Sequence, residues 1–201
     1  MTSTMNDFPD TEKKLKSRIS SYRSALTREK KSFGYVNDGA GKRYVLFSLY
    51  FVLNDLQKSQ AYFEWYEDEF SDDVGEPIQK LCWALSLQRM GRAREAEKML
   101  AETMLSNLYL IPHLLGQEVA EYDIWHSSSD EYKGYVEYLP QQVKGAVTEA
   151  ELQWVKTLYE SSGFRQIRQR YVEIYRELQS IEDYDKRRKL LDEAHALLEI
   201  L

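Results

Sequence analysis

Scarcity of chain-breaking residues is the feature that most constrains how this chain can fold. Its 201 residues include nine glycines and four prolines, about half the usual share of these two residue types. A sheet protein of this length needs many tight turns, and glycine and proline supply much of the chemistry of such turns. The sequence therefore predicts an all-α protein built from long helices with few breaks.

Composition indicates a chain that folds in water. Hydrophobic residues make up 43% of the sequence and charged residues 30%, which is too apolar for intrinsic disorder. The length suits one domain, and no linker-like stretch divides it. We therefore expect a single helical domain over residues 1–201.

Charge and cysteine usage restrict the classes of function and the compartment. A net charge of -6 disfavours binding of phosphate backbones. The lone Cys82 excludes an intramolecular disulfide framework, so we expect the protein in a reducing cytoplasm. Cys82 lies in an apolar helical run, so we expect it to be a small buried side chain. Long uninterrupted apolar stretches are lacking, and Met1 to Thr11 does not resemble a signal peptide, so neither export nor a membrane span is expected.

Hydrophobic periodicity divides the chain into four regions. Asp10 is the expected cap of a first helix, which ends before Gly34 and is followed by a loop. The expected regions are a cap helix and loop at 11–41, two helical hairpins at 42–106, a helix and an irregular aromatic loop at 107–147, and the C-terminal helices at 148–201.

Turn and capping signals predict the boundaries of the later helices. Pro112 is expected to begin a helix that continues through Val119. Residues 123–140 are polar and aromatic and predict a long loop with one short helical piece. Thr148 and Glu151 have the spacing of a capping box, which opens a helix expected to end at Gly163. Two more helices follow, with a break between residues 180 and 184.

The segment Gly91–Ala96 resembles the interhelix turn of tetratricopeptide repeats. There a glycine ends the first helix, and a small residue five positions later lets the second helix pack closely. Asn54–Ser59 has the same spacing 37 residues earlier (91 minus 54), and asparagine tolerates the left-handed conformation that glycine adopts. The resemblance implies a right-handed array of antiparallel helical hairpins with N- and C-terminal capping helices.

The resemblance also implies a groove along the first helix of each hairpin. It assigns one side of these helices to packing, namely Leu46, Phe47, Tyr50, Trp83, Ala84 and Leu87. It places Tyr44, Ser48, Phe51, Leu81, Leu85 and Gln88 on the inner face, where a partner's peptide or amphipathic helix would bind. The lysine and asparagine that clamp a terminal carboxylate in some members are missing, and the chain's own C-terminal helices are an alternative occupant.

Aromatic residues supply a second candidate surface. Tyr132, Tyr135 and Tyr138 are spaced by three in a weakly structured segment, where burying all three together is difficult. Tyrosine suits interfaces because it combines a large contact area with a polar tip. We therefore expect these three side chains to contact a partner.

Three classes of function follow. The first is a cytoplasmic interaction module, either an adaptor or a partner-sequestering protein. The second is a structural protein that forms a homodimer through the stripe Leu190–Leu198. The third is an enzyme or small-ligand binder around Asp123–Asp130, which includes His126, or an anion site at the loop Gly39–Lys42. A basic face at the C-terminal hairpin could also contact nucleic acid, which the net charge disfavours. We predict no catalytic residue, metal ligand or cofactor.

Overall fold

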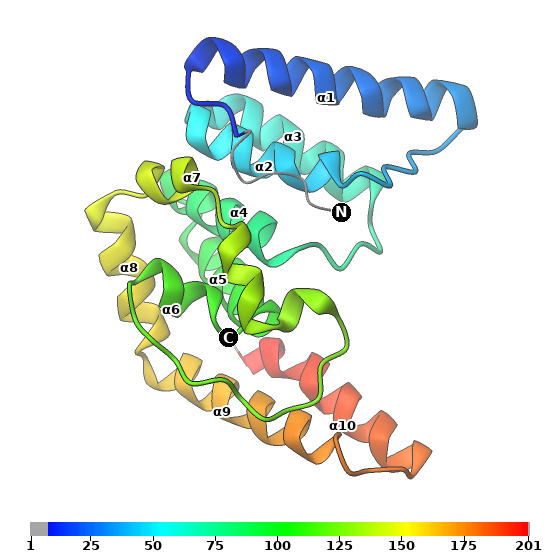
Figure 1. The fold of residues 1–201 in the computed structure, drawn as a ribbon, viewed down its shortest axis with the longest axis vertical. Coiled ribbons are helices and arrows are strands. Elements are labelled where there is room, and N and C mark those ends of the chain that lie inside the picture. The colour runs from blue at the N-terminus through cyan, green and yellow to red at the C-terminus, as the bar shows by residue number, and fades with distance from the viewer. Residues whose placement is uncertain (1–7, 201) are drawn as a thin grey trace.

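The computed structural model describes residues 8–200, and every regular element among them is a helix (Figure 1). The α-helices are α1 (Glu12–Phe33), α2 (Lys42–Leu53), α3 (Leu56–Glu69), α4 (Pro77–Arg89), α5 (Ala93–Ser106), α6 (Leu110–Leu114), α7 (Gln141–Ala146), α8 (Glu149–Tyr159), α9 (Ser162–Glu177) and α10 (Tyr184–Ala196). Three short 3₁₀ helices are η2 (Ser129–Glu131), η3 (Lys133–Tyr138) and η4 (Leu197–Ile200). The all-α prediction is confirmed.

The sequence predicts neither a signal peptide nor a membrane span. Residues 1–7, which make up most of the stretch Met1 to Thr11 for which no signal peptide is expected, lie outside the described residues. Among residues 8–200, no helix combines the length and apolarity needed to cross a membrane.

Both turns that carry the family resemblance end a helix as expected. Asn54 adopts a left-handed φ of 56° after α2, and Gly91 adopts a φ of 75° after α4. At Gly91 the backbone N–H of Arg92 donates to the Leu87 carbonyl at 3.0 Å, and the Gly91 N–H donates to the Gln88 carbonyl at 3.1 Å. This pair of bonds is the Schellman motif, which satisfies the last carbonyls of a helix.

The first helix begins one residue later than predicted. Its N-cap is Thr11, whose extended backbone lets the hydroxyl accept a hydrogen bond from the Lys14 N–H at 3.4 Å. Asp10 lies too early to reach that N–H, and its carboxylate pairs with Lys14 Nζ at 2.8 Å instead. The predicted end before Gly34 is confirmed.

The predicted helix from Pro112 to Val119 is wrong at both ends. α6 begins at Leu110 and ends at Leu114, because Gly116 turns left-handed with a φ of 69°. Val119 lies in the irregular stretch that follows.

The C-terminal half contains more short helices than predicted, and one boundary is wrong. The capping box at the start of α8 is confirmed, since the Thr148 N–H donates to Glu151 Oε2 at 2.7 Å. α8 ends at Tyr159 rather than at Gly163, because the Ser161 hydroxyl caps α9 and places Gly163 inside that helix. The stretch 123–140 holds η2 and η3 instead of one helical piece, and α7 was not predicted.

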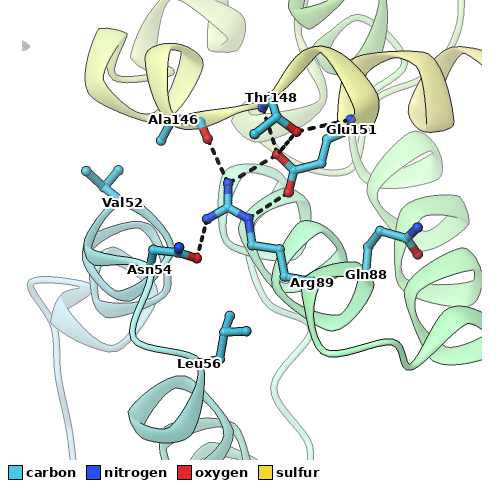
Figure 2. A pocket seen from close by; sticks show the side chains of 8 residues that line it. All are labelled: Val52, Asn54, Leu56, Gln88, Arg89, Ala146, Thr148 and Glu151. Carbon is cyan, nitrogen blue, oxygen red and sulfur yellow. Dashed lines mark hydrogen bonds and ion pairs between the residues drawn. The ribbon is translucent and has the colours of Figure 1, made fainter.

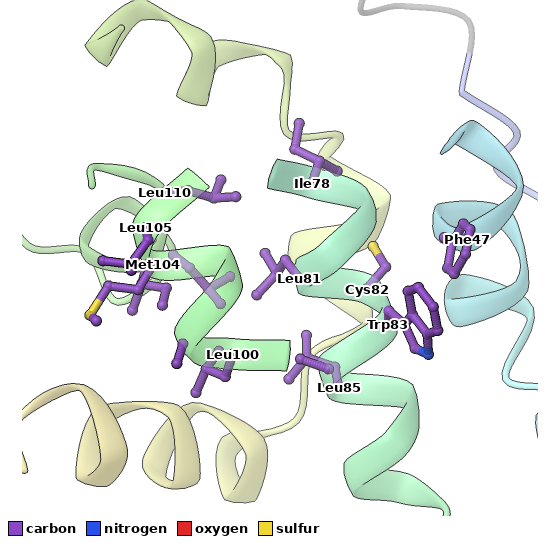
Figure 3. Close-up of a cluster of buried hydrophobic side chains, with 14 of the residues drawn as sticks. Phe47, Ile78, Leu81, Cys82, Trp83, Leu85, Leu100, Met104, Leu105 and Leu110 are labelled. Carbon is purple, nitrogen blue, oxygen red and sulfur yellow. The ribbon is translucent and has the colours of Figure 1, made fainter. Parts of the chain in front are cut away.

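Two helices, α2 and α4, are buried on several sides. Residues 46–51 of α2 and residues 81–87 of α4 are buried without interruption, a pattern typical of helices surrounded by others. Figure 3 shows Phe47 of α2 beside Trp83 of α4, with ring centroids 5.1 Å apart. Cys82 is fully buried, as predicted. All six side chains assigned to packing are buried: Leu46, Phe47, Tyr50, Trp83, Ala84 and Leu87.

The chain runs from one end of the molecule to its middle through α5, returns toward α2, which α7 contacts, and reaches the other end in α9 and α10. α1, α2 and α3 lie at one end, α4 and α5 in the middle, and α9 and α10 at the other end (Figure 1). α4 contacts both α2 and α5. An irregular segment, residues 117–128, runs across α9 and is tied to it where the Trp125 N–H donates to the Tyr175 carbonyl at 2.9 Å.

Candidate functional site

The predicted inner face is largely covered by the protein's own helices. Ser48, Phe51, Leu81 and Leu85 are buried, with 4% or less of each exposed, while Tyr44 and Gln88 are half-buried. Figure 3 shows Leu81 and Leu85 pointing toward α5, where Leu100 and Met104 lie. In this arrangement a partner would reach these leucines only by displacing α5. Their role in partner binding stays a prediction.

A hollow of about 560 Å³ opens at one end of this face, between the α2–α3 turn, the end of α4 and the α7–α8 turn (Figure 2). Its lining residues are Val52, Asn54, Leu56, Gln88, Arg89, Ala146, Thr148 and Glu151. Of the predicted inner face, only Gln88 is among them, and it points away from the hydrogen-bonded group in Figure 2.

Arg89 is the centre of this hollow, and all of its N–H groups are used. Nε donates to Glu151 Oε1 at 2.7 Å, and Nη2 donates to Glu151 Oε2 at 3.2 Å and to the Ala146 carbonyl at 2.7 Å. Nη1 donates to the Phe51 carbonyl at 3.1 Å and to Asn54 Oδ1 at 3.0 Å. A guanidinium group has five donors, so none remains for a ligand.

Glu151 completes this group as a buried carboxylate. Burial alone would raise the pKa of its carboxyl group, but the hydrogen bonds from Arg89 and Thr148 hold that pKa below its usual range. The group therefore ties α2 and α4 to α8 and has no free acid or base. Sequence reasoning found only the capping box, because the pairing of Arg89 with Glu151 joins residues 62 positions apart.

The three predicted contact tyrosines have different environments. Tyr132 is 50% exposed and Tyr138 is 62% exposed, whereas Tyr135 is buried with 9% exposed. The ring of Tyr135 lies 5.9 Å from that of Tyr138, and Tyr132 packs against the ring of His126 at 4.3 Å. Two of the three thus present aromatic surface to solvent, and the third belongs to the core. Their contact with a partner stays a prediction.

Asn107 holds the segment that carries these tyrosines. This buried side chain donates through Nδ2 to the carbonyls of Asp130 at 2.6 Å and Tyr132 at 3.2 Å, and its Oδ1 accepts from the Tyr109 N–H at 2.9 Å. Sequence reasoning missed Asn107, because the two carbonyls that its Nδ2 bonds lie more than 20 residues away along the chain.

The region Asp123–Asp130 does not assemble as an acid–base or metal cluster in the described structure. Asp123 accepts a hydrogen bond from Gln179 at 2.9 Å. His126 Nδ1 lies 3.6 Å from Glu131, not beside either predicted aspartate. Among residues 8–200, no group of three histidine, cysteine or acidic side chains is arranged to hold a metal ion.

The loop Gly39–Lys42 leads into α2, whose first residue is Lys42. The start of this helix is already occupied by an anion of the chain itself. The Asp38 carboxylate accepts from the N–H groups of Lys42 at 3.0 Å and Arg43 at 2.7 Å. It therefore takes the position that an external phosphate would occupy at a helix N-terminus. The predicted anion site is contradicted at this helix.

A network of ionisable groups lies between α2 and the α3–α4 loop. Arg43 Nε donates to Asp73 Oδ2 at 2.6 Å, and the Tyr44 hydroxyl donates to Asp73 Oδ1 at 2.7 Å. Burial, followed by the hydrogen bond to Asp73, raises the pKa of Tyr44. Glu76, the N-cap of α4, lies beside this network, and burial, followed by the nearby Asp130 charge, raises its pKa to about 7.

The C-terminal leucine stripe is mostly covered within the chain. Ala194 and Leu197 are buried, and Leu190, Leu191 and Leu198 are half-buried against the core. α10 packs on α9, and η4 contacts α5 and α9. Homodimerisation through this stripe stays a prediction.

Comparisons with known proteins identify no relative. Neither a protein-family model, nor a curated protein, nor a solved structure matches the chain.

Proposed function

We propose that this protein is an interaction module that binds a partner protein through Tyr132 and Tyr138. The observation that carries the proposal is the exposure of these two aromatic side chains, 50% and 62%, on a segment that is itself fixed to the core. Aromatic residues are enriched among the residues that dominate binding energy at interfaces. Both side chains offer a large contact area and a hydroxyl group.

Fixation of the segment favours binding, because less conformational freedom is lost when a partner docks. Three features hold the segment in place. The buried Asn107 bonds its backbone on either side of Glu131, the buried Tyr135 anchors its middle, and Lys133 Nζ donates to the Val119 carbonyl at 2.8 Å. Tyr132 and Tyr138 are therefore presented on a prepared surface.

The same proposal includes a scaffold of tetratricopeptide-like hairpins, α2–α3 and α4–α5. Its support is the matching left-handed turn residues Asn54 and Gly91 and the buried packing positions of α2 and α4. In this scheme the tyrosine segment, and not the covered face of α4, contacts the partner. The lone buried Cys82 supports a cytoplasmic setting, since the fold uses no disulfide among the described residues.

The test is a comparison of tagged wild-type protein with the double variant Tyr132→Ala/Tyr138→Ala in cells of the source organism. Proteins recovered with each bait are identified by mass spectrometry. Tyr184→Ala is the matched control, because Tyr184 is a tyrosine with 76% exposed surface on α10. Far-UV circular dichroism of all three proteins verifies that the helices are retained.

We expect a partner that is recovered with the wild type and with Tyr184→Ala, and lost with the double variant. Losing two aromatic anchors typically weakens an interface by about 2 kcal/mol or more, which is at least roughly thirtyfold in affinity. Recovery of the same partner by all three baits would contradict the proposed surface.

A further inference from the structure

A second hollow lies on α9 and gathers positive charge on an otherwise acidic protein. Its volume is about 430 Å³, and Arg165, Arg168 and Arg176 line it together with Tyr122 and Val172. We call this site the arginine hollow. The whole chain carries a net charge of -6, so the three guanidinium groups give this hollow a local charge opposite in sign to that of the whole protein.

Arg168 is held in place within this hollow. Its Nη1 donates to the Tyr159 carbonyl at 3.2 Å and to Met104 Sδ at 3.4 Å, and its guanidinium lies 4.0 Å from the centre of the Tyr159 ring. The N–H groups of Nε and Nη2 have no acceptor among residues 8–200. A fixed guanidinium with free donors suits recognition of a carboxylate.

Arg165 and Arg176 flank Arg168 on the same helix and are uncommitted. Both are exposed, and neither has a carboxylate within ion-pair distance in the described part of the chain. Their separation of 11 positions corresponds to about 16 Å along the helix axis. Glu173, the carboxylate that lines the hollow, accepts from Arg170 at 3.3 Å and from Gln169 at 3.1 Å, so its charge is already paired.

We propose that the arginine hollow binds an acidic peptide segment of a partner protein. Carboxylates of the peptide pair with Arg165 and Arg176, and an apolar side chain between them packs against Tyr122 and Val172. An extended peptide covers the distance between the two arginines with about five residues, at roughly 3.3 Å per residue. This site shares no lining residue with the tyrosine segment, so it stands independently of the surface proposed above.

Surrounding charge favours a peptide over a nucleic acid. Recognition of a phosphate backbone relies on a continuous basic face, but the next arginine of α9, Arg170, is paired with three carboxylates. Its partners are Glu173 at 3.3 Å, Glu177 at 3.5 Å and Glu193 at 2.6 Å. A short peptide in the hollow meets, besides the three arginines, only Glu173, whose charge is already paired, whereas a long polyanion would also meet Glu177 and Glu193.

The experiment measures fluorescence anisotropy with the full-length protein and two labelled synthetic peptides. The first is a peptide of about ten residues, enough to span the hollow, with alternating glutamates and a central leucine. In the second, glutamine replaces every glutamate. The variant Arg165→Ala/Arg176→Ala removes the two uncommitted arginines, and Arg94→Ala/Arg188→Ala is the control with an identical change in net charge. Arg94 and Arg188 are exposed and lie outside the hollow.

We expect the wild type to bind the glutamate peptide and not the glutamine peptide. The hollow variant should bind the glutamate peptide roughly tenfold more weakly, as expected for the loss of two ion pairs, and the control variant should bind as the wild type does. Equal binding of both peptides, no binding of the glutamate peptide, or equal weakening in both variants would overturn the proposal. So would tighter binding of a single-stranded oligonucleotide that the hollow variant abolishes.

Discussion

At the scale of single residues, Arg89 and Glu151 show how a polar pair can join distant parts of a helical chain. Arg89 lies at the end of α4, and its guanidinium lies 4.1 Å from the centre of the Phe51 ring in α2. Its side chain is 15% exposed and that of Glu151 is 9% exposed. Removing one member of such a pair leaves the other charge buried without a partner, which is more costly than the pair is stabilising.

Replacing Arg89 with alanine should therefore lower the free energy of unfolding by about 3–5 kcal/mol. Urea denaturation followed by circular dichroism measures this change. Arg92→Ala is the matched control, because Arg92 pairs with Glu95 near the surface and exposed pairs contribute less than about 1 kcal/mol. Equal costs for the two variants would show that the Arg89 group does not tie the helices together.

Glu76 gives a prediction about pH. Its pKa in the folded protein is raised from an ordinary 4.5 to about 7, so the folded state binds more protons than the unfolded state between these values. Its stabilising contribution is complete below about pH 4.5 and is lost as pH rises through about 7. The full shift would correspond to about 3 kcal/mol, and solvent contact at this half-buried carboxyl reduces that to roughly 1 kcal/mol.

The variant Glu76→Gln cannot acquire this charge, so it should gain stability relative to the wild type as pH rises from about 5 to about 8. Thermal unfolding of both proteins at the two pH values measures the difference. Gln79 Oε1 would still accept from the backbone N–H of residue 76, as it does now at 2.9 Å. A difference in melting temperature that stays constant with pH would contradict the raised pKa.

At the scale of elements, the central question is whether the inner face of α4 is open or covered. Leu85 is fully buried and points toward α5. Leu85→Glu should therefore unfold the protein. The free-energy cost of burying an unpaired carboxylate in a core exceeds the usual 0.5–3 kcal/mol cost of a single substitution by roughly several kcal/mol. Gln88→Glu, at a half-buried position of the same helix, is the control and should fold normally.

The measurement is the far-UV circular dichroism and the cooperativity of thermal unfolding of these two variants. If Leu85→Glu kept the wild-type helicity and unfolding transition, the face would be open and the partner groove along Leu81 and Leu85 would regain its support.

Local chemistry explains which elements the sequence could predict. Asn54, Gly91 and the capping box at Thr148 act on residues within one turn, so the helix ends they produce were predicted correctly. The helix expected at Pro112 failed because Gly116 stops it within one turn and because α6 begins before the proline. Sequence reasoning placed Pro112 at the first position of the helix. Proline is also tolerated at the other positions of the first turn, where its missing N–H costs no hydrogen bond within the helix, and Pro112 is the third residue of α6.

Long-range contacts explain what sequence reasoning could not reach at the candidate sites. Tyr132, Tyr135 and Tyr138 have the same residue type and spacing, yet only Tyr135 is buried. The difference depends on how η3 lies on the core, which Asn107 helps to fix from another part of the chain. Asp38 is a different case, because the N–H groups that its carboxylate accepts from lie only four and five residues later, so this cap is local and sequence reasoning overlooked it.

At the scale of the whole molecule, the described helices cover most of the face expected to bind, and two other surfaces stay accessible. One is the tyrosine segment around η3, and the other is the arginine hollow on α9. Irregular residues 117–128 connect them, since Tyr122 lines the hollow and His126 packs on Tyr132. We expect a partner to contact the protein at the tyrosine segment.

Site-specific photocrosslinking tests this claim most directly. A photoreactive phenylalanine derivative is placed at Tyr138 in the full-length protein, and in a control at Tyr184, which is also an exposed tyrosine. After irradiation of living cells, we predict a discrete crosslinked product for position 138 that is missing for position 184. The absence of a product at position 138, or the same product at both positions, would contradict the account.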